Sequence, residues 1–399
     1  MVKIPIFTAM IQRTDTATLA QLFKSNPSVA IFGARQIGKT TLARLYATKA
    51  RKETLYLDLE LESHFNRLQN DPESYLLKNK EKLIILDEVQ RMPRLFALLR
   101  ALIDMDRKPC RFLLLGSSAP HLVKGVSESL AGRIAYLDMG GINIKEAEKN
   151  KIKQDDLWLK GGFPVALTLK RNSDIPIWYN NLIRSYTEKD MNELFGVSFS
   201  PVTIRNFWNM LAHHNGSVWN KETYARSLGI TAPTVGRYLE YMEGAFLVTR
   251  LQPWFVNSKK RLVKAPKIYI RDTGILHTLL KVNDADELFG HPGVGASWES
   301  FVIEQVRQLK PAHLDMYFYR THQGAEADLV LAKGTKPVAC IEIKLSTSPQ
   351  VSKGFYQTIG DLKTKHNYVV IPSGDSYVVH EKTTVCSLGE FVSVHLGQL

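Results

Sequence analysis

The stretch SVAIFGARQIGKT (28–40) decides the fold class of the first part of the chain. Its apolar run VAIF (29–32) is typical of a short strand that is buried on both faces. The eight residues GARQIGKT (33–40) then match the pattern G-x-x-x-x-G-K-[ST] in full, and a helical pattern starts at Lys39. A strand, a glycine-containing loop and a helix in this order predict the phosphate-binding loop of a nucleotide site.

Each residue type in this loop has a physical reason to bind a nucleotide. Gly33 and Gly38 let backbone N–H groups turn towards phosphate oxygens, and the N-terminus of the helix adds partial positive charge. Lys39 is predicted to bridge the β- and γ-phosphates of ATP, and the Thr40 hydroxyl to bind Mg²⁺. The predicted nucleotide-binding residues are Gly33, Ala34, Arg35, Gln36, Ile37, Gly38, Lys39, Thr40 and Thr41, together with Ser117 further along the chain.

A second motif, LIILDEV (83–89), supplies the acids that ATP hydrolysis needs. Asp87 ends a buried apolar run, where an unpaired carboxylate is costly, and is therefore predicted to hold Mg²⁺ through water. Glu88 is predicted to orient or deprotonate the attacking water, which makes Glu88 and Lys39 candidate catalytic residues. The acidic pair favours water as the phosphoryl acceptor, and transfer to a small molecule is the lesser alternative.

Further strand-like runs extend the same pattern. TLYLDLE (54–60) and RFLLLGSS (111–118), separated by helical patterns, predict an α/β domain with a parallel sheet. Ser117 ends one of these strands, where it can contact the γ-phosphate or simply form a turn. Arg133 in SLAGRI (129–134) is a third candidate catalytic residue, for the γ-phosphate of its own or of a neighbouring subunit. The alternative for Arg133 is a surface arginine.

The composition is that of a globular protein with more than one domain. A length of 399 residues predicts two to three domains, and 44% hydrophobic and 23% charged residues are ordinary values. The 52 Lys and Arg against 39 Asp and Glu give a formal charge of +13, which indicates a polyanionic partner, nucleic acid above all, or else a basic surface without a special task. Isolated cysteines and the lack of a long apolar run predict a cytoplasmic protein without a membrane span.

A helix–turn–helix pattern lies between residues 221 and 251. Gly229 breaks the first helix, and a second helix starts at Thr231. Thr231, Thr234 and Arg237 then point outward, as in the recognition helix of a winged helix that enters the DNA major groove. The apolar face of this helix carries Val235, Leu239 and Met242. Basic residues that could contact DNA phosphates follow, and they are Lys259, Lys260, Arg261, Lys264 and Lys267. The alternative is a lid or a protein contact.

The last part of the chain is expected to become strand-like from IYIRDTGIL (268–276) onward, and it contains an ordered set of acids followed by a lysine. Glu299 lies in a predicted helix, Asp328 starts an apolar strand, and Glu342 and Lys344 alternate with apolar residues in CIEIKLS (340–346). A period of two residues puts Glu342 and Lys344 on the same face of a strand. A salt-bridged pair on a sheet surface would produce the same local pattern.

The order of the motifs resembles a bacterial and archaeal family of AAA-type P-loop ATPases with a C-terminal domain of unknown function that is related to restriction endonucleases. The resemblance covers nearly the whole chain and implies ATP as ligand, Mg²⁺ as cofactor and an oligomeric assembly. The segments that carry it are GARQIGKTT (33–41), LDEVQRMP (86–93), LLGSSAPHL (114–122), SLAGRI (129–134), GGFP (161–164), YIRDTGIL (269–276), WESFVIEQV (298–306) and EIKLS (342–346).

The acids and the lysine of the last part resemble, in their order, the restriction-endonuclease-like nucleases. In that superfamily the Asp and Glu hold Mg²⁺ and the Lys positions or activates a water. The resemblance implies a nuclease site at Asp328, Glu342 and Lys344, with Glu299 either as a further ligand or as a residue that supports the ligands. A domain of the same fold that docks to DNA or protein without cutting is the alternative.

Together these patterns predict four parts with different tasks. They are a P-loop ATPase core (1–150), a helical lid or linker (151–218), a winged helix (219–260) and a restriction-endonuclease-like α/β domain (261–399). The leading interpretation is an ATPase that acts on DNA and has a nuclease-like C-terminal domain. The alternative is a regulatory switch, in which ATP binding changes the domain arrangement and the C-terminal domain docks without cleaving.

Overall fold

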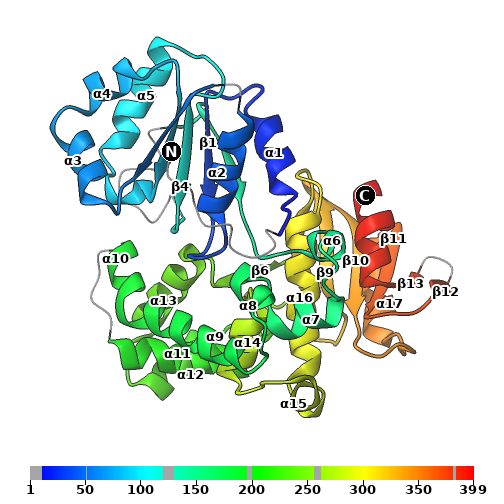
Figure 1. The fold of residues 1–399 in the computed structure, drawn as a ribbon. Helices are drawn as coiled ribbons and strands as arrows, with labels where there is room; N and C mark the ends of the chain where they lie inside the picture. Colours follow the sequence, from blue (N-terminus) through cyan, green and yellow to red (C-terminus); the bar gives the residue numbers. More distant parts are fainter. Residues whose placement is uncertain (1–10, 51, 120–129, 196–199, 256–261, 381–382) are drawn as a thin grey trace.

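The computed structural model describes residues 11–50, 52–119, 130–195, 200–255, 262–380 and 383–399. Figure 1 shows the N-terminal part (blue and cyan) above the helical middle part (green), with the C-terminal part (orange and red) to one side. Within these described ranges, no helix combines the length and the apolar character that crossing a membrane requires.

The N-terminal part is built on a sheet of parallel strands, which confirms the predicted α/β architecture. The strand order over the described residues is β2-β3-β4-β1-β5. The edge strand β5 is missing from the sequence-based prediction. The strands are β1 (Ser28–Phe32), β2 (Thr54–Asp58), β3 (Leu83–Asp87), β4 (Phe112–Gly116) and β5 (Ile134–Asp138), all paired in parallel with their neighbours.

Alternate residues of these strands face two layers of helices. Val29 and Ile31 of β1 pack with the helices α1 and α2, whereas Ala30 and Phe32 pack with α3, α4 and α5. Strands that are buried on both faces need continuous apolar runs, which is why the runs were recognisable in the sequence. The helices are α1 (Asp15–Leu22), α2 (Lys39–Lys49), α3 (Glu62–Asn70), α4 (Pro72–Lys78) and α5 (Leu95–Met105).

The predicted helical region from 145 to 215 is confirmed, and it packs beside the loop that follows β1. Phe163, Tyr186 and Trp208 belong to one buried cluster with Ile37 of that loop. The helical region therefore covers the place where a nucleotide is expected. Its elements are α6 (Ile144–Lys149), α7 (Gln154–Lys160), α8 (Pro164–Thr168), α9 (Asp174–Ser185), the π-helical segment Tyr186–Asp190, α10 (Met191–Phe195) and α11 (Pro201–His213).

The helix–turn–helix consists of α12 (Lys221–Leu228) and α13 (Ala232–Gly244). Gly229 ends α12 with φ 66°, a left-handed conformation that glycine adopts without strain. Thr231 is the N-cap of α13, and its side chain accepts a hydrogen bond from the backbone N–H of Thr234. The Thr231 hydroxyl is thus used to cap the start of α13, which accounts for its position on the outer side of the helix. The predicted apolar face is confirmed, because Val235, Leu239 and Met242 are buried.

A two-stranded antiparallel hairpin, β6 (Val248–Pro253) and β7 (Lys267–Ile270), follows α13. The stretch YIRDTGIL (269–276), expected to open a strand-like region, leaves the strand after Ile270. The Asp272 side chain accepts a hydrogen bond from the Ile275 backbone N–H at 3.0 Å and caps α14 (Thr273–Leu279). An Asp N-cap was therefore the signal that the expectation overlooked.

The C-terminal part shares one sheet with this hairpin, in the order β12-β13-β11-β10-β9-β8-β6-β7 over the described residues. Gln252 and Pro253 of β6 pair in parallel with β8. The expected boundary at residue 261 thus falls between the paired strands β6 and β7. The strands are β8 (Asp315–Arg320), β9 (Glu326–Lys333), β10 (Lys336–Ile343), β11 (His366–Ile371), β12 (Tyr377–His380) and β13 (Thr383–Ser387).

Helices cover this second sheet, and the longest of them is the predicted one. Trp298 and Phe301 of α16 (Val294–Leu309) pack in one buried cluster with Leu329 and Ile341 of the sheet. The helix thereby carries Glu299 to the sheet. The other helices are α15 (Ala285–Gly290), α17 (Lys353–Leu362) and α18 (Leu388–Glu390).

Candidate active site

The loop between β1 and α2 has a backbone that needs its glycines. A Cβ atom on Gly33 would lie 2.3 Å from the carbonyl oxygen of Met139, so this position admits no side chain. Gly38 has φ 103° at the start of α2, and Gln36 also has a positive φ of 62°. A loop of this form, followed by a helix N-terminus at Lys39, concentrates backbone N–H groups where an anion binds.

The Lys39 ammonium lies buried inside this loop. Its Nζ atom donates hydrogen bonds to the carbonyl oxygens of Gly33 and Ala34, at 3.0 and 2.9 Å, and to Ser117 Oγ at 2.9 Å. Burial lowers the pKa of Lys39, and the nearby Glu88 carboxylate opposes that effect. The cation is therefore fixed beside the loop, where it can neutralise phosphate charge.

Thr40, in the first turn of α2, meets Asp87 at the carboxyl end of β3. Thr40 Oγ1 donates a hydrogen bond to Asp87 Oδ2 at 2.7 Å, and the Tyr56 hydroxyl donates to the same oxygen. Burial raises the pKa of Asp87, and hydrogen bonds from Tyr56 and Thr40 work against this rise. Mg²⁺ prefers oxygen ligands and takes one or two protein carboxylates, so the Thr40 hydroxyl and the Asp87 carboxylate fit this ion.

Glu88 follows Asp87 in a left-handed backbone conformation, with φ 52° and ψ 47°. This conformation is uncommon for a residue with a Cβ atom, and such residues are frequent at functional sites. Ser117 Oγ donates a hydrogen bond to Glu88 Oε1 at 2.7 Å, and the Gln90 amide donates to the other carboxylate oxygen. Ser117 thus links Lys39 to Glu88, whereas the sequence left its task open between phosphate contact and turn.

Arg133 lies near the amino ends of the sheet strands, whereas the phosphate loop follows the carboxyl end of β1. Residue 134 starts β5 and pairs with Ser28 at the start of β1, and Ser28 Oγ donates to the Arg133 carbonyl oxygen at 2.7 Å. The loop follows the other end of β1, about 16 Å away for five residues of extended strand. The Arg133 guanidinium donates to both oxygens of Asp104, at 2.7 and 2.9 Å. Arg133 therefore lies too far away to contact the γ-phosphate of its own subunit, which leaves a contact in a neighbouring subunit or a surface arginine as the alternatives.

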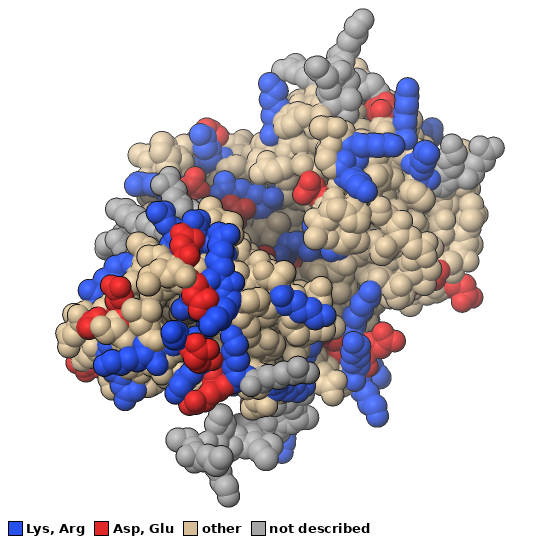
Figure 2. Space-filling model, turned by 90° about the horizontal axis from the view of Figure 1, so that it is seen from above, with Lys and Arg blue, Asp and Glu red and all other residues tan. Residues whose placement is uncertain are grey.

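The candidate DNA-binding residues of α13 lie on its outer side. Arg237 is exposed, Thr234 is half-buried, and Arg237 Nη2 donates to Thr234 Oγ1 at 3.4 Å. Lys259, Lys260 and Arg261 lie outside the described residues. On the face drawn in Figure 2, Lys and Arg side chains surround a hollow and reach into it, with Asp and Glu interspersed.

Lys267 does not belong to the solvent-facing basic cluster in which the sequence placed it. It is 4% exposed, and its Nζ atom lies 3.2 Å from Glu326 Oε1, 3.3 Å from Glu299 Oε1 and 3.8 Å from Asp328 Oδ1. Burial alone would lower the pKa of Lys267, but these carboxylates together raise it. The lysine of β7 is therefore the internal counter-ion of acids in the C-terminal part.

The structure brings the candidate nuclease residues close together, in two groups that each contain one lysine. Glu299 and Asp328 lie around Lys267, whereas Lys344 Nζ pairs with Glu342 Oε1 at 2.9 Å. The Ile343 backbone N–H between them donates to Asp328 Oδ2 at 2.8 Å, which joins the two groups. In the part of the chain that the structure describes, no group of three or more His, Cys, Asp or Glu side chains is arranged to hold a metal ion.

Sequence reasoning missed several residues of both sites. Tyr56 and Gln90 hold the acids of the loop site, and their positions in the sequence carry no motif of their own. Lys267 had a readable signal, because KIYI (267–270) has the short apolar character of a strand, and a lysine that starts such a strand is open to burial. Sequence reasoning grouped Lys267 with the basic residues before it and therefore missed that it is buried.

Three families match consecutive parts of the chain. A family described as an AAA domain matches residues 25–148, which contain the phosphate loop and the Asp87–Glu88 pair. Two families described as domains of unknown function, DUF8612 and DUF4143, match residues 152–286 and 294–391. The DUF8612 match includes both strands of the β6–β7 hairpin, in agreement with their pairing.

Relatives and solved structures extend the comparison over most of the chain. Uncharacterized proteins of Mycobacterium tuberculosis and Mycobacterium bovis are each 39% identical over 364 residues, which is 91% of this chain and 80% of theirs. A Walker-type ATPase of Pyrococcus abyssi is 16% identical, with a TM-score of 0.44 over 68% of this chain and 96% of that one. The RuvB Holliday junction branch migration motor of Thermotoga maritima is 17% identical, with a TM-score of 0.31 over 60% and 90%. The identity with the mycobacterial proteins and the order of the matched domains show that the chain belongs to the family of P-loop ATPases that combine an AAA domain with a C-terminal DUF4143 domain.

Proposed function

We propose that the chain hydrolyses ATP at the loop between β1 and α2. The observation that carries this proposal is a hydrogen-bond chain from Lys39 Nζ through Ser117 Oγ to Glu88 Oε1, with lengths of 2.9 and 2.7 Å. This chain puts a cation for the phosphates and a carboxylate for the attacking water on one network. Thr40 and Asp87 lie beside it as the pair that would hold Mg²⁺.

Each group has one task in this proposal. Lys39 and the loop N–H groups bind the β- and γ-phosphates and stabilise the negative charge that develops during transfer. Mg²⁺, when bound by Thr40 and Asp87, would neutralise charge on the β- and γ-phosphate oxygens. Glu88 accepts a hydrogen bond from the attacking water and orients it, and Ser117 holds the Glu88 carboxylate in place.

The direct test is phosphate release from ATP by the purified chain in Mg²⁺ buffer, without any added acceptor. Release under these conditions supports hydrolysis, since water is then the available acceptor. ATP consumption that begins after a small-molecule acceptor is added would replace the proposal by a kinase.

We further propose that Arg133 stabilises the transition state in a neighbouring subunit of an oligomer. Arg133→Ala should then lower kcat far more than it changes the affinity for ATP, because the contact forms during transfer. Mixing Arg133→Ala with Lys39→Ala subunits should restore part of the activity, since mixed interfaces pair an intact loop with an intact arginine. Arg107→Ala is the matched control, because Arg107 is 61% exposed and also faces Asp104. A wild-type kcat for Arg133→Ala would make Arg133 a surface residue.

DNA is the partner that we propose for the helix–turn–helix and its hairpin. The exposed Arg237 on α13, the basic residues 259–261 and the formal charge of +13 support this partner. In this proposal α12, α13, β6 and β7 form a winged helix, and the parts 1–150 and 151–218 provide the ATPase core and its lid.

DNA binding should be salt-sensitive and largely independent of sequence. We expect Arg237→Ala to reduce the slope of log affinity against log salt by about one, the value for one lost phosphate contact. Replacing Lys259, Lys260 and Arg261 together should flatten the slope further. Arg171→Ala is a control from an exposed arginine outside this region, with a side chain that is 78% exposed. Binding curves at several salt concentrations decide, and slopes equal to wild type would remove these residues from the interface.

A second candidate function is a regulatory switch whose C-terminal domain docks to DNA or protein without cutting it. The buried Lys267 favours this reading, because its ammonium lies against the carboxylates of Glu299 and Asp328, where a metal ion would have to bind. A restriction-endonuclease-like fold with a nuclease site at Asp328, Glu342 and Lys344 is the competing proposal. Nicking of supercoiled plasmid with Mg²⁺ or Mn²⁺ that disappears in Asp328→Ala and in Lys344→Ala would support the nuclease.

A further inference from the structure

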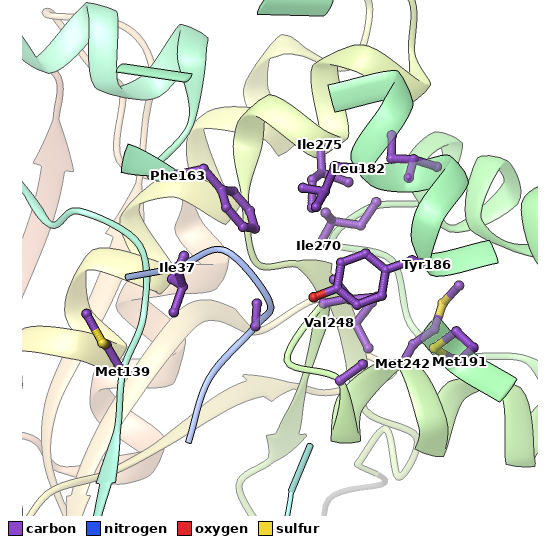
Figure 3. Packing of buried hydrophobic residues seen from close by; sticks show 14 of the residues in the cluster. Ile37, Met139, Phe163, Leu182, Tyr186, Met191, Met242, Val248, Ile270 and Ile275 are labelled. Atoms are coloured by element: carbon purple, nitrogen blue, oxygen red, sulfur yellow. The ribbon is translucent and has the colours of Figure 1, made fainter. Parts of the chain in front are cut away.

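Side chains of the helical region hold Arg35, the third residue of the phosphate loop. Its guanidinium forms an ion pair with Asp190 and lies 3.5 Å from Glu60 Oε1. Its backbone N–H donates a hydrogen bond to the Tyr186 hydroxyl oxygen at 2.8 Å. Figure 3 shows the Tyr186 ring with this hydroxyl directed towards the loop that carries Ile37. Main chain and side chain of one loop residue are thus both tied to the π-helical segment Tyr186–Asp190.

Asp190 is a buried carboxylate that depends on Arg35 for its counter-charge. It is 1% exposed, and besides Arg35 it accepts a hydrogen bond from Ser185 Oγ at 2.8 Å. Removing the cation from a buried pair leaves an uncompensated charge, which is strongly unfavourable. Any ligand that draws Arg35 away must therefore also alter the surroundings of Asp190.

Arg35 lies in the loop that would hold the phosphates, directly after Ala34, whose carbonyl oxygen accepts a hydrogen bond from Lys39 Nζ at 2.9 Å. Its charge contributes to lowering the pKa of Lys39, which burial lowers most. Burial and then Glu88 raise the pKa of Glu60, and Arg35 counteracts part of this rise. The charges of Arg35, Lys39, Glu60 and Glu88 therefore influence one another. A guanidinium binds phosphate oxygens through two parallel hydrogen bonds, so a phosphate can compete with the carboxylates of Asp190 and Glu60 for Arg35.

We propose that Arg35 is the residue that distinguishes ATP from ADP, and that it exchanges Asp190 for the γ-phosphate when ATP binds. ADP lacks that phosphate, so Arg35 stays with Asp190 when ADP is bound. The inference rests on the proposed ATP site and adds the means by which the site senses the nucleotide.

The exchange has a route to the helix–turn–helix. Asp190 ends a five-residue π-helical segment. Such segments are rare in proteins as a whole, and those that occur are often found at functional sites. The Tyr186 ring packs edge-on against Trp208 of α11, with centroids 6.1 Å apart, and Phe195 packs on Tyr241 of α13 at 4.7 Å. The π-helical segment and α10 therefore contact α11 and α13 through these aromatic pairs, and we expect the affinity for DNA to differ between the ATP and ADP states.

The experiment measures dissociation constants of ADP and of the β,γ-imido analogue of ATP for the full chain. Arg35→Ala should reduce the preference for the ATP analogue over ADP by about tenfold, within the usual range of coupling between a ligand and a two-state element. Asp190→Asn should increase this preference, because Arg35 no longer has to leave a charged partner. In the double variant the effect of Asp190→Asn should vanish, since the residue through which it acts is gone.

Matched variants separate this exchange from a structural task. Arg35→Lys keeps the charge and should retain part of the preference, and Asp174→Asn alters the exposed Arg171–Asp174 pair of α9 and should change nothing. Equal shifts of both nucleotides in Asp190→Asn, or an effect of Asp190→Asn that persists in the Arg35→Ala background, would overturn the inference. A wild-type chain that binds neither nucleotide would instead overturn the proposed ATP site, and the inference with it.

Discussion

Glu88→Gln should give a protein that binds ATP with nearly wild-type affinity and hydrolyses it about 10³-fold more slowly, within the range for losing a general base. Glutamine keeps the size of the side chain and can still accept the hydrogen bond from Ser117, so the loop should keep its shape. It cannot take a proton from water, and its amide does not orient the water as a carboxylate does. Single-turnover hydrolysis with separately measured ATP binding tests this expectation.

The matching change on the phosphate side is Lys39→Ala, which should abolish hydrolysis and also weaken binding. The Lys39 ammonium contributes to the ground state as well as to the transition state, because it pairs with the phosphates in both. Lys49→Ala, at the other end of the same helix and exposed, is the control and should behave as wild type. Wild-type turnover in both Glu88→Gln and Lys39→Ala would place the hydrolytic site elsewhere.

Lys267→Ala should destabilise the chain by about 3 kcal/mol, the lower end of the cost of breaking a buried ion pair. The substitution leaves Glu299, Glu326 and Asp328 around a space that held an ammonium. Lys264→Ala is the control, because Lys264 is exposed on the same segment. Chemical unfolding followed by tryptophan fluorescence measures the difference, and equal stability of the two variants would contradict the counter-ion assignment.

The loss should also depend on pH. Burial, followed by the neighbouring Glu299, raises the pKa of Asp328 to about 7, and Lys267 counteracts this rise. A raised carboxyl pKa in the folded state favours the protonated form, so this group's effect on stability becomes less favourable as pH rises from the unfolded value towards 7. Without Lys267 the unfavourable effect grows, and the variant should lose more stability at pH 8 than at pH 5. An equal loss at both pH values would show that Asp328 does not titrate against Lys267.

The nucleotide site could be predicted from the sequence because its parts are local. The residues of GARQIGKT (33–40) act through a loop that their own spacing defines, and parallel strands bring Asp87 and Ser117 to the same edge of the sheet. The order of apolar runs therefore carried most of the information about this part. Arg133 could not be placed in this way. Its position depends on the end of β5 at which it lies, and sequence reasoning did not recognise β5.

The acidic site could not be predicted in the same way, because its central charge comes from another part of the chain. Lys267 lies 32 residues before Glu299, and pairing of β6 with β8 brings β7 to the C-terminal sheet. A local pattern contains no information about such pairing. For the same reason the sequence divided the chain at residue 261, inside what the structure makes one sheet.

The shared sheet has a consequence for any attempt to isolate the C-terminal domain. A fragment that begins at residue 294, where the DUF4143 match starts, lacks β6 and therefore exposes the backbone of β8 along an open edge. Open strand edges recruit strands from other molecules and lead to aggregation. The same fragment would carry Asp328 and Glu299 without their ammonium. We therefore expect a fragment that retains the hairpin, from Val248 onward, to aggregate less than one that begins at residue 294.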